Sequence, residues 1–517
     1  MKKTDIIFAF IFSLNFINFA FAQSVNTIIL NDNWQFLKSD LGGIWEAVRP
    51  VQDGNPEGLP FWENITLPHC YNASDAVDPD INYYQGPAWY KTQLEIKNPY
   101  KNGRTFFHFE GSGQKTEVYV YTSKVGSHVG GYDEWTVDIT EAVNSFLNDK
   151  KATAPFNSKV PLSIRCDNTR DLEMLPSDLS DFNLYGGIYR YLNLVYVPSL
   201  SIEQLHIDSK VDAKGTAGNY EMSLKLANKS AESKAILWLE IIDNQGKLIN
   251  SSNQEITVFE GEKSVFTAKI KKPKLWSTVL PNLYTCKATI TTESGTQTVI
   301  EKFGFRHFDF VEKGPFMFNG SRLLLRGTHR HEDHAGLGAA MTEDLMRREM
   351  KLMKEMGVNF IRLGHYQQSR IILNLCDSLG ILVWVEIPWC RGGLGAEVYK
   401  EQGRRMMTNM INQHKNHPSV ILWGLGNEND WPGDFAEFDK QKIRDYMTEL
   451  HLLSHKLDPT RLTTIRRCDF CKDIPDVYSP SIWAGWYRGM YTKTNKGWHN
   501  TLFFRCSIGH RMEYLYC

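Results

Sequence analysis

The chain has 517 residues, of which 23% are charged and 12% aromatic. This length can bury several hydrophobic cores, so we expect two to four domains and exclude a disordered or fibrous protein. With 58 Lys and Arg residues against 59 Asp and Glu residues, the formal net charge is −1. A chain without a basic excess is not expected to bind nucleic acid or an anionic membrane surface.

The first 22 residues have the three-part pattern of a secretory signal peptide. A basic start over residues 1–3 precedes a largely apolar stretch over residues 6–21, and the small residues Ala20 and Ala22 mark a cleavage site. We therefore expect cleavage after Ala22 and export to the periplasm, the cell surface or the medium. No later segment reaches the roughly 18 apolar residues of a spanning helix, so no membrane span is expected.

Residues 23–310 are predicted to form two β-sandwich domains. Short segments in which apolar and polar residues alternate, such as Arg104–Glu110 and Tyr220–Leu226, are separated by Gly, Pro, Asn and Asp. Alternation with frequent turn residues is typical of antiparallel sheets. We place the boundary between the two domains after residue 200, and the second domain, 201–310, has the size of an immunoglobulin-like sandwich.

After residue 320, predicted strands alternate with predicted helices. The strands are Leu323–Gly327, Asn359–Gly364, Ile381–Ile387, Val420–Leu425, Leu462–Arg466 and Val477–Trp483. The helices are Thr342–Met356, Ile371–Leu379, Gly403–Asn412 and Lys440–Lys456. Regular alternation of this kind predicts a parallel sheet closed into a TIM (β/α)8 barrel.

The predicted barrel domain, residues 311–517, is incomplete. A full eight-stranded barrel takes about 250 residues, whereas six clear strands are predicted here and residues 502–504 are the candidate for a seventh. Residues 497–517 have neither a helical period nor capping residues. Our hypothesis is that this tail replaces the authentic end of the domain, through truncation or a change of reading frame.

The strand Val420–Leu425 is the most informative segment of the chain. An unbroken apolar run ends here in Gly426-Asn427-Glu428. A buried strand that ends in an amide and a carboxylate is how a parallel barrel presents a catalytic acid. The alternative interpretation, an exposed carboxylate after a strand, is less consistent with this context.

Motifs in every predicted domain resemble glycoside hydrolase family 2, the group of exo-acting β-galactosidases and β-glucuronidases. They follow the family order: Trp62–His69, Gly86–Tyr90, Asp181–Arg190, Leu275–Trp276, Pro281–Tyr284, Gly304–Arg306, Arg326–His334, Arg362–Tyr366 and Gly426–Glu428. The resemblance implies a jelly-roll sugar-binding domain over 23–200, the immunoglobulin-like domain, and a catalytic barrel that acts on a carbohydrate.

The resemblance also implies a retaining glycosidase in which Glu428 is the general acid/base. Such a carboxyl group gives a proton to the leaving oxygen and then takes one from water. Asn427 would hydrogen-bond the 2-hydroxyl of the sugar. We expect a terminal β-linked galactose as the substrate sugar, with β-glucuronide as the alternative.

Further residues are candidates for binding the sugar. They are Arg362, His365, His331, Asp181, Asn82 and Trp483. Arg362 and the two histidines fall at strand ends on the catalytic face, and Asp181 and Asn82 would reach it from the first domain. Trp483 would be a stacking platform, because the C–H faces of sugars pack on aromatic rings. The alternative for His331 and His365 is that they are loop residues hydrogen-bonded to the backbone. The alternative for Trp483 is that it is buried inside the barrel.

Two departures from the family pattern concern the chemistry. Cys390 stands where the magnesium-dependent members place a glutamate, so we expect neither a metal nor a cofactor. The family nucleophile lies in an apolar-Glu-aromatic-Gly setting on the seventh strand, and the nearest imitation, Met512-Glu513-Tyr514, lacks the glycine. We therefore expect a chain without a clear nucleophile.

Two other interpretations follow from the missing nucleophile and the incomplete barrel. The first is a non-catalytic glycan-binding protein, in which the partial site holds a sugar without cleaving it. The second is a product that does not fold, because an open barrel exposes the edges of its terminal strands.

Overall fold

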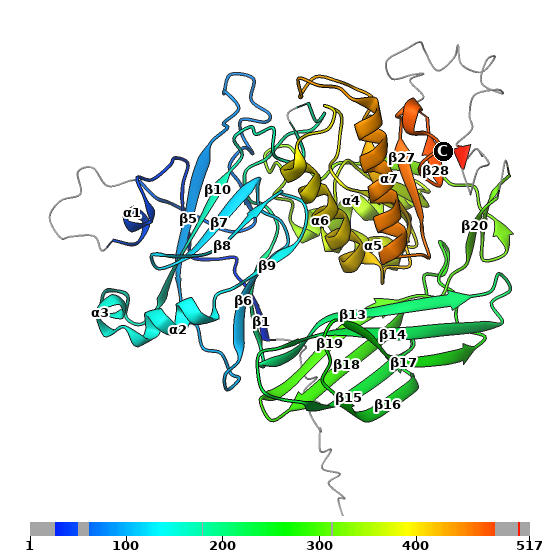
Figure 1. The fold of residues 1–517 in the computed structure, drawn as a ribbon, viewed down its shortest axis with the longest axis horizontal. Helices are drawn as coiled ribbons and strands as arrows, with labels where there is room; N and C mark the ends of the chain where they lie inside the picture. Colours follow the sequence, from blue (N-terminus) through cyan, green and yellow to red (C-terminus); the bar gives the residue numbers. More distant parts are fainter. Residues whose placement is uncertain (1–25, 50–60, 178, 312–313, 481–504, 507–517) are drawn as a thin grey trace, which may run out of the picture.

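The structure is a computed structural model that describes residues 26–49, 61–177, 179–311, 314–480 and 505–506. Its elements form two β-sheet units and a unit in which helices cover a parallel sheet (Figure 1). The predicted signal peptide, residues 1–22, lies outside the described residues. So do Trp483 and all of the predicted tail except residues 505–506.

The first unit packs two antiparallel sheets around one core. Their strand orders are β1-β12-β6-β9 and β3-β2-β5-β10-β7-β8, while β4 pairs with β11. The strands are β1 (Asn26–Ile29), β2 (Trp34–Leu37), β3 (Glu63–Ile65), β4 (His69–Cys70), β5 (Pro87–Leu94), β6 (Arg104–Phe109), β7 (Lys115–Val120), β8 (Ser123–Val129), β9 (Trp135–Asp138), β10 (Val160–Asp167), β11 (Gly187–Ile188) and β12 (Leu192–Val197). Buried residues alternate along β6 and β7, as predicted for a sandwich.

Short helices, which the sequence patterns did not predict, flank this unit. They are α1 (Ile44–Val48), α2 (Thr140–Asn148), α3 (Lys150–Thr153) and the 3₁₀ turn Ala154–Phe156. Asp149 caps α3, because its side chain accepts hydrogen bonds from the backbone N–H groups of Lys151 and Ala152.

The second unit also consists of two antiparallel sheets, with the orders β13-β14-β17 and β16-β15-β18-β19. The strands are β13 (Leu200–Val211), β14 (Ala217–Asn228), β15 (Lys234–Ile242), β16 (Leu248–Thr257), β17 (Glu262–Lys271), β18 (Tyr284–Thr292) and β19 (Gly295–Phe303). Tyr220, Met222 and Leu224 point inward from β14 and meet Leu237 and Leu239 of β15 in the core between the sheets. A small sheet follows, formed by β20 (Phe308–Phe310), β21 (Phe316–Phe318) and β22 (Ser321–Arg322).

The third unit is a curled sheet whose first six strands are parallel and adjacent in chain order. The strands are β23 (Gly327–Arg330), β24 (Phe360–Leu363), β25 (Leu382–Glu386), β26 (Val420–Asn427), β27 (Leu462–Arg466) and β28 (Val477–Ser479). The helices are α4 (Glu343–Glu355), α5 (Arg370–Leu379), α6 (Glu397–His414) and α7 (Lys440–Leu457), with a 3₁₀ turn at Asp469–Cys471. The short strand β29 (Arg505–Cys506) pairs antiparallel with β28.

The helix boundaries follow from capping residues. Thr342 and Ser369 cap α4 and α5, because the side chain of each accepts a hydrogen bond from a backbone N–H group of the first turn. Asp439 does the same for α7. Gly380 ends α5 at φ 68°, a left-handed conformation that glycine adopts without a steric penalty.

Two predicted boundaries are wrong, for identifiable reasons. The first barrel strand is Gly327–Arg330 rather than Leu323–Gly327, because Leu325 packs into the apolar cluster beside the small sheet instead of pairing with β24. Helix α6 begins at Glu397 and continues through Gly403, which lies against the Tyr446 hydroxyl where a larger residue would not fit. The sixth strand is described as Val477–Ser479, and its predicted end, Trp483, lies outside the described residues.

Two ion pairs, one of them fully buried, fix the first unit against the parallel sheet. Arg190 donates to a Glu332 carboxylate oxygen at 2.9 Å and to the Gln367 carbonyl at 2.7 Å, and both charged side chains are almost completely buried. Glu134 binds Arg370 of α5 in the same interface. These contacts hold the loop before β11 over the carboxyl ends of the parallel strands.

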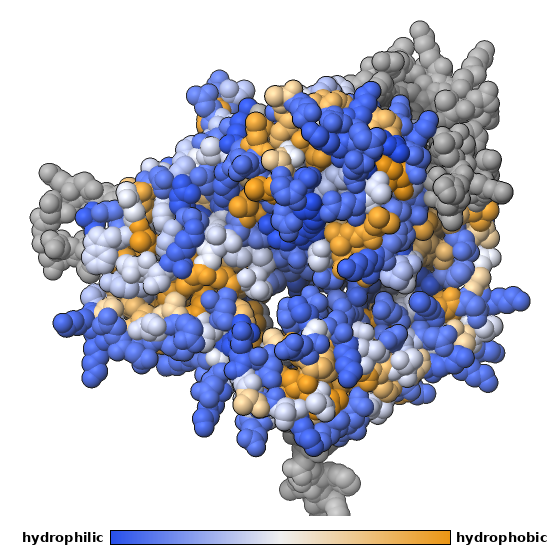
Figure 2. Space-filling view, viewed as in Figure 1, coloured by the Kyte–Doolittle hydropathy of each residue, from blue (hydrophilic) through white to orange (hydrophobic). Residues whose placement is uncertain are grey.

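The outer surface is largely hydrophilic on the face drawn in Figure 2, with dispersed apolar patches and a hollow where the three units meet. In the part of the chain that the structure describes, no helix combines the length and the apolar character needed to cross a membrane.

Candidate active site

A cluster of polar side chains lies at the carboxyl ends of β23 to β27. In parallel sheets these ends meet at one edge, where barrel enzymes place their catalytic groups. All eight residues of β26 are buried, and Glu428 follows the strand directly. The apolar strand thus anchors the carboxylate, as the sequence predicted.

Glu428 is buried and held by two guanidinium groups. Its Oε2 accepts a hydrogen bond from Arg391 Nε at 2.8 Å, and its Oε1 accepts one from Arg466 Nη1 at 2.9 Å. The residue is only 3% exposed, and its φ of 52° lies in the left-handed region that non-glycine residues rarely adopt. Conformations of this kind concentrate at functional sites.

Arg391 links Glu428 to Asp181 of the first unit. Its Nη2 lies 2.8 Å from Glu428 Oε2 and 2.7 Å from Asp181 Oδ2, while the Cys390 thiol donates to Asp181 Oδ1 at 3.3 Å. Burial raises the pKa of Asp181, but His365 and Arg391 outweigh this effect and hold the pKa below its ordinary value. Asp181 is therefore a carboxylate at the site, reaching it from the first unit as predicted.

Asn427 and Arg362 belong to a buried hydrogen-bond network below Glu428. Arg362 Nη2 donates to Asn427 Oδ1 at 2.9 Å and to Glu386 Oε1 at 2.7 Å, and Arg362 Nε donates to Glu386 Oε2 at 3.0 Å. His365 Nδ1 lies 2.7 Å from the same Glu386 Oε1. Burial raises the pKa of Glu386, with Arg362 opposing that shift. The network fixes the amide of Asn427 beside Glu428.

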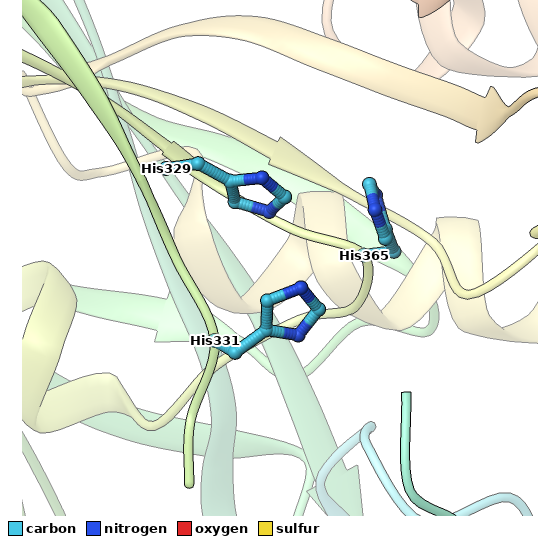
Figure 3. A group of neighbouring side chains, drawn as sticks. All are labelled: His329, His331 and His365. Atoms are coloured by element: carbon cyan, nitrogen blue, oxygen red, sulfur yellow. The ribbon is translucent and has the colours of Figure 1, made fainter. Parts of the chain in front are cut away.

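Three imidazole rings, those of His329, His331 and His365, face a common space next to this network (Figure 3). Their centroids are 4.8 Å apart for His329 and His331, 4.8 Å for His329 and His365, and 5.4 Å for His331 and His365. Desolvation and the nearby Arg362 lower the pKa of His329 to about 3, and desolvation also lowers the pKa of His331. The rings of His329 and His331 are therefore neutral, and each offers both a donor and an acceptor, as sugar hydroxyls require.

The same residues include potential metal ligands. One nitrogen from each of the three histidines lies within 4.8 Å of the others, and Asp181, His365 and Cys390 form a second such group. The positive charge of Arg362, which is bonded to His365 at 3.1 Å, opposes a divalent cation here. Burial raises the pKa of the Cys390 thiol, so the thiolate that binds metals is disfavoured. The arrangement suits a polar organic ligand better than a metal.

The structure therefore brings together most of the predicted site residues. The assembled residues are Glu428, Asn427, Arg362, His365, His331 and Asp181. Asn82 is exposed in the loop before β5, and no described hydrogen bond joins it to the cluster, so its predicted place in the site is not supported. Trp483 lies outside the described residues.

Sequence reasoning missed Glu386, Arg391, Arg466 and His329. Glu386 ends a fully buried strand, so the rule that singled out Glu428 would also have found it. Arg466 ends β27 and His329 lies in β23, which was misplaced by four residues. Arg391 lies in a loop, where no periodic pattern identifies it.

Comparison with known families identifies the fold that carries this cluster. Residues 200–306 match the model described as glycosyl hydrolases family 2, and residues 310–503 match the model of the family 2 TIM barrel domain. The chain belongs to glycoside hydrolase family 2. Its parallel sheet is thus part of a TIM-barrel domain, and Glu428 lies where that domain places its chemistry.

Similar family 2 proteins carry two different enzyme names. The β-glucuronidase of Parabacteroides merdae is 62% identical with a TM-score of 0.88, and the match covers 90% of this chain and 60% of that one. The β-glucuronidase of Bacteroides fragilis is 30% identical over 84% of this chain and 60% of its own length. The β-galactosidase of Thermoanaerobacterium thermosulfurigenes is 31% identical over 87% of this chain and 60% of its own length. The chain thus spans about 60% of the length of these relatives.

Proposed function

We propose that this site binds terminal β-linked glucuronic acid and that Glu428 acts as the general acid/base of a retaining β-glucuronidase. The observation that carries the proposal is the buried carboxylate directly after β26, in a left-handed backbone conformation and with Asn427 fixed beside it. A retaining mechanism needs such a carboxyl group to protonate the leaving oxygen and then to activate water.

Two observations support a glucuronide rather than the galactoside that the sequence first suggested. The relative with the highest identity named above, at 62%, is a β-glucuronidase. In addition, Arg391 and Arg466 lie at the rim with side chains 20% and 26% exposed, and guanidinium groups bind carboxylates in a planar, bidentate manner. A β-galactosidase remains the second candidate, supported by the relative of that name.

The described residues supply an acid/base but no attacking carboxylate that we can assign. Glu386 is fully buried, and both of its oxygens are bonded to Arg362 or His365, so it is not free to attack a sugar. A single carboxyl group cannot both protonate the leaving group and form the glycosyl-enzyme. We therefore propose that residues 26–480 bind the sugar and position the acid, and that the nucleophile is supplied by residues outside them.

We also propose finer assignments for the other parts of the chain. The two sheets of the first unit are a jelly-roll sugar-binding domain, and those over residues 200–306 are an immunoglobulin-like domain. The support for both assignments is that each domain has paired antiparallel sheets around a single core.

Residues 1–22 direct export. Mass spectrometry of protein secreted by the native host should find Gln23 at the N-terminus, and an intact Met1 would contradict export.

Isothermal titration calorimetry with two methyl glycosides tests the substrate assignment. Methyl β-D-glucuronide should bind the full chain at least about tenfold more tightly than methyl β-D-galactoside, a difference of about 1.4 kcal/mol. Asp181→Ala should weaken binding of both sugars, because it removes an acceptor at the site. Equal or tighter binding of the galactoside would favour the second candidate, and binding that Asp181→Ala leaves unchanged would place the sugar elsewhere.

A further inference from the structure

A cluster of potential metal ligands lies at the other end of the parallel sheet from Glu428. His451 and His455 occupy the last two turns of α7, and Asp476 immediately precedes β28. Residues four apart in a helix face the same side, so both imidazoles point toward the start of β28. One ligand atom from each of the three side chains lies within 4.8 Å of the others.

Thr463 orients two members of this cluster. Asp476 Oδ2 accepts hydrogen bonds from the Thr463 backbone N–H at 2.7 Å and from the Thr463 hydroxyl at 3.0 Å. Since the hydroxyl hydrogen is used for Asp476, the 2.8 Å contact between His451 Nδ1 and Thr463 Oγ1 must have the imidazole as donor. His451 therefore carries its lone pair on Nε2, the nitrogen that is free to bind a metal.

The remaining ligand atoms are also accessible. His455 Nε2 lies 2.8 Å from Asp476 Oδ2, and no described hydrogen bond takes Asp476 Oδ1 or His451 Nε2. The side chains of His455 and Asp476 are 30% and 15% exposed, so an ion can reach them from solvent. Hydrogen-bonded partners that fix a histidine tautomer and a carboxylate are the usual surroundings of metal ligands.

We propose that His451, His455 and Asp476 bind a divalent transition metal, with Zn²⁺ as the ion to be tested. Two imidazole nitrogens and a carboxylate oxygen form a common ligand set for this class of ion, and water would complete a tetrahedral site. The ion would replace the direct bond between His455 and Asp476 and would connect α7 to the segment before β28. Its role is to stabilise this end of the sheet, far from the sugar site.

Zinc titration of the full chain, without a polyhistidine tag, tests the proposal. Isothermal titration calorimetry should show one tight site, and His451→Gln or His455→Gln should each weaken it by at least about tenfold, while circular dichroism confirms folding. The matched control is His334→Gln, which alters an exposed histidine outside the cluster and should leave zinc binding unchanged. His329→Gln should also leave it unchanged, and loss of binding in that variant alone would place the metal among the three histidines of the sugar site.

A second measurement does not depend on any variant. In a crystal of the full chain grown with Zn²⁺, anomalous diffraction at the zinc edge should give a peak among His451, His455 and Asp476. A peak only elsewhere, or calorimetric binding that both α7 variants retain, would overturn the proposal.

Discussion

Two guanidinium groups bind the Glu428 carboxylate, and Arg391 shares its charge with Asp181. A general acid must be within hydrogen-bond reach of the leaving oxygen to which it gives its proton. A sugar that occupies the site would compete for Asp181 and thereby change the surroundings of Arg391. We infer that substrate binding rearranges the contacts of Arg391 with Asp181 and Glu428.

The role of Glu428 can be separated from that of a nucleophile by varying the leaving group. In a catalytically active form of this protein, Glu428→Ala should reduce hydrolysis of glucuronides with poor leaving groups by about 10²–10⁴-fold, because these need protonation. Activated aryl glucuronides should lose less, and added azide should partly restore their turnover. Equal losses for good and poor leaving groups, without rescue, would mean that Glu428 has another role.

The buried ion pair between Arg362 and Glu386 is expected to affect the free energy of unfolding. Glu386→Gln leaves the buried Arg362 without its counter-ion, and breaking a buried pair in this way costs about 3–5 kcal/mol. Urea unfolding followed by tryptophan fluorescence measures the loss. The matched control is Glu255→Gln in the exposed pair with Lys234, which should leave the midpoint unchanged. Similar midpoints for the two variants would show that the buried pair is not important for stability.

At the scale of elements, the parallel strands and their helices were predicted well where an apolar run or a capping residue marked the element. Val420–Leu425 is uniformly apolar, and Thr342 caps α4 as expected. The first barrel strand was predicted at Leu323–Gly327 because this run of apolar residues is typical of a strand. In the structure, its apolar side chains pack into a neighbouring hydrophobic cluster. Only tertiary packing distinguishes these two possibilities.

Gly403 is a second position where tertiary packing overrides the local sequence pattern, and a substitution there can test this. Replacing a glycine inside a helix with alanine normally stabilises a protein by up to about 1 kcal/mol. Here an alanine Cβ would overlap the Tyr446 hydroxyl, and Tyr446 is 3% exposed and packed on Trp389. Gly403→Ala should therefore destabilise the protein by about 1–3 kcal/mol in urea unfolding. Adding Tyr446→Phe should recover part of the loss, and a stabilising Gly403→Ala would show that Tyr446 can move aside.

At the scale of the whole molecule, the site depends on contacts between units that no local pattern reveals. Asp181 was predicted through its family motif, but its contact with Arg391 requires the first unit to lie over the sheet, which the Arg190–Glu332 pair secures. The second unit is joined to α6 in a comparable way. His206 donates to Glu262 Oε1 at 2.7 Å and to the Asn412 carbonyl at 3.0 Å, and Lys415 lies 3.6 Å from Glu262.

The contact between His206 and Glu262 should weaken at low pH. The hydrogen bond from His206 lowers the pKa of Glu262 to about 2, from an ordinary value near 4.5. Its stabilising contribution is therefore present above pH 4.5 and is lost as the pH falls toward 2. The protection of backbone amides from hydrogen exchange in β17 and at the end of α6 should decrease as the pH is lowered from 5 to about 3, and Glu262→Gln should reduce this dependence. Parallel pH profiles for the two proteins would rule out Glu262 as the origin.

A crystal structure with methyl β-D-glucuronide tests the central claim most directly, since it shows where the sugar and Glu428 meet. The glycosidic oxygen should lie about 2.6–3.2 Å from a Glu428 carboxyl oxygen, the hydrogen-bond reach of a general acid. We expect Asp181 and His331 to contact hydroxyls and a guanidinium group to face the uronate. A sugar bound with its glycosidic oxygen away from Glu428, or bound outside this cluster, would contradict the assignment.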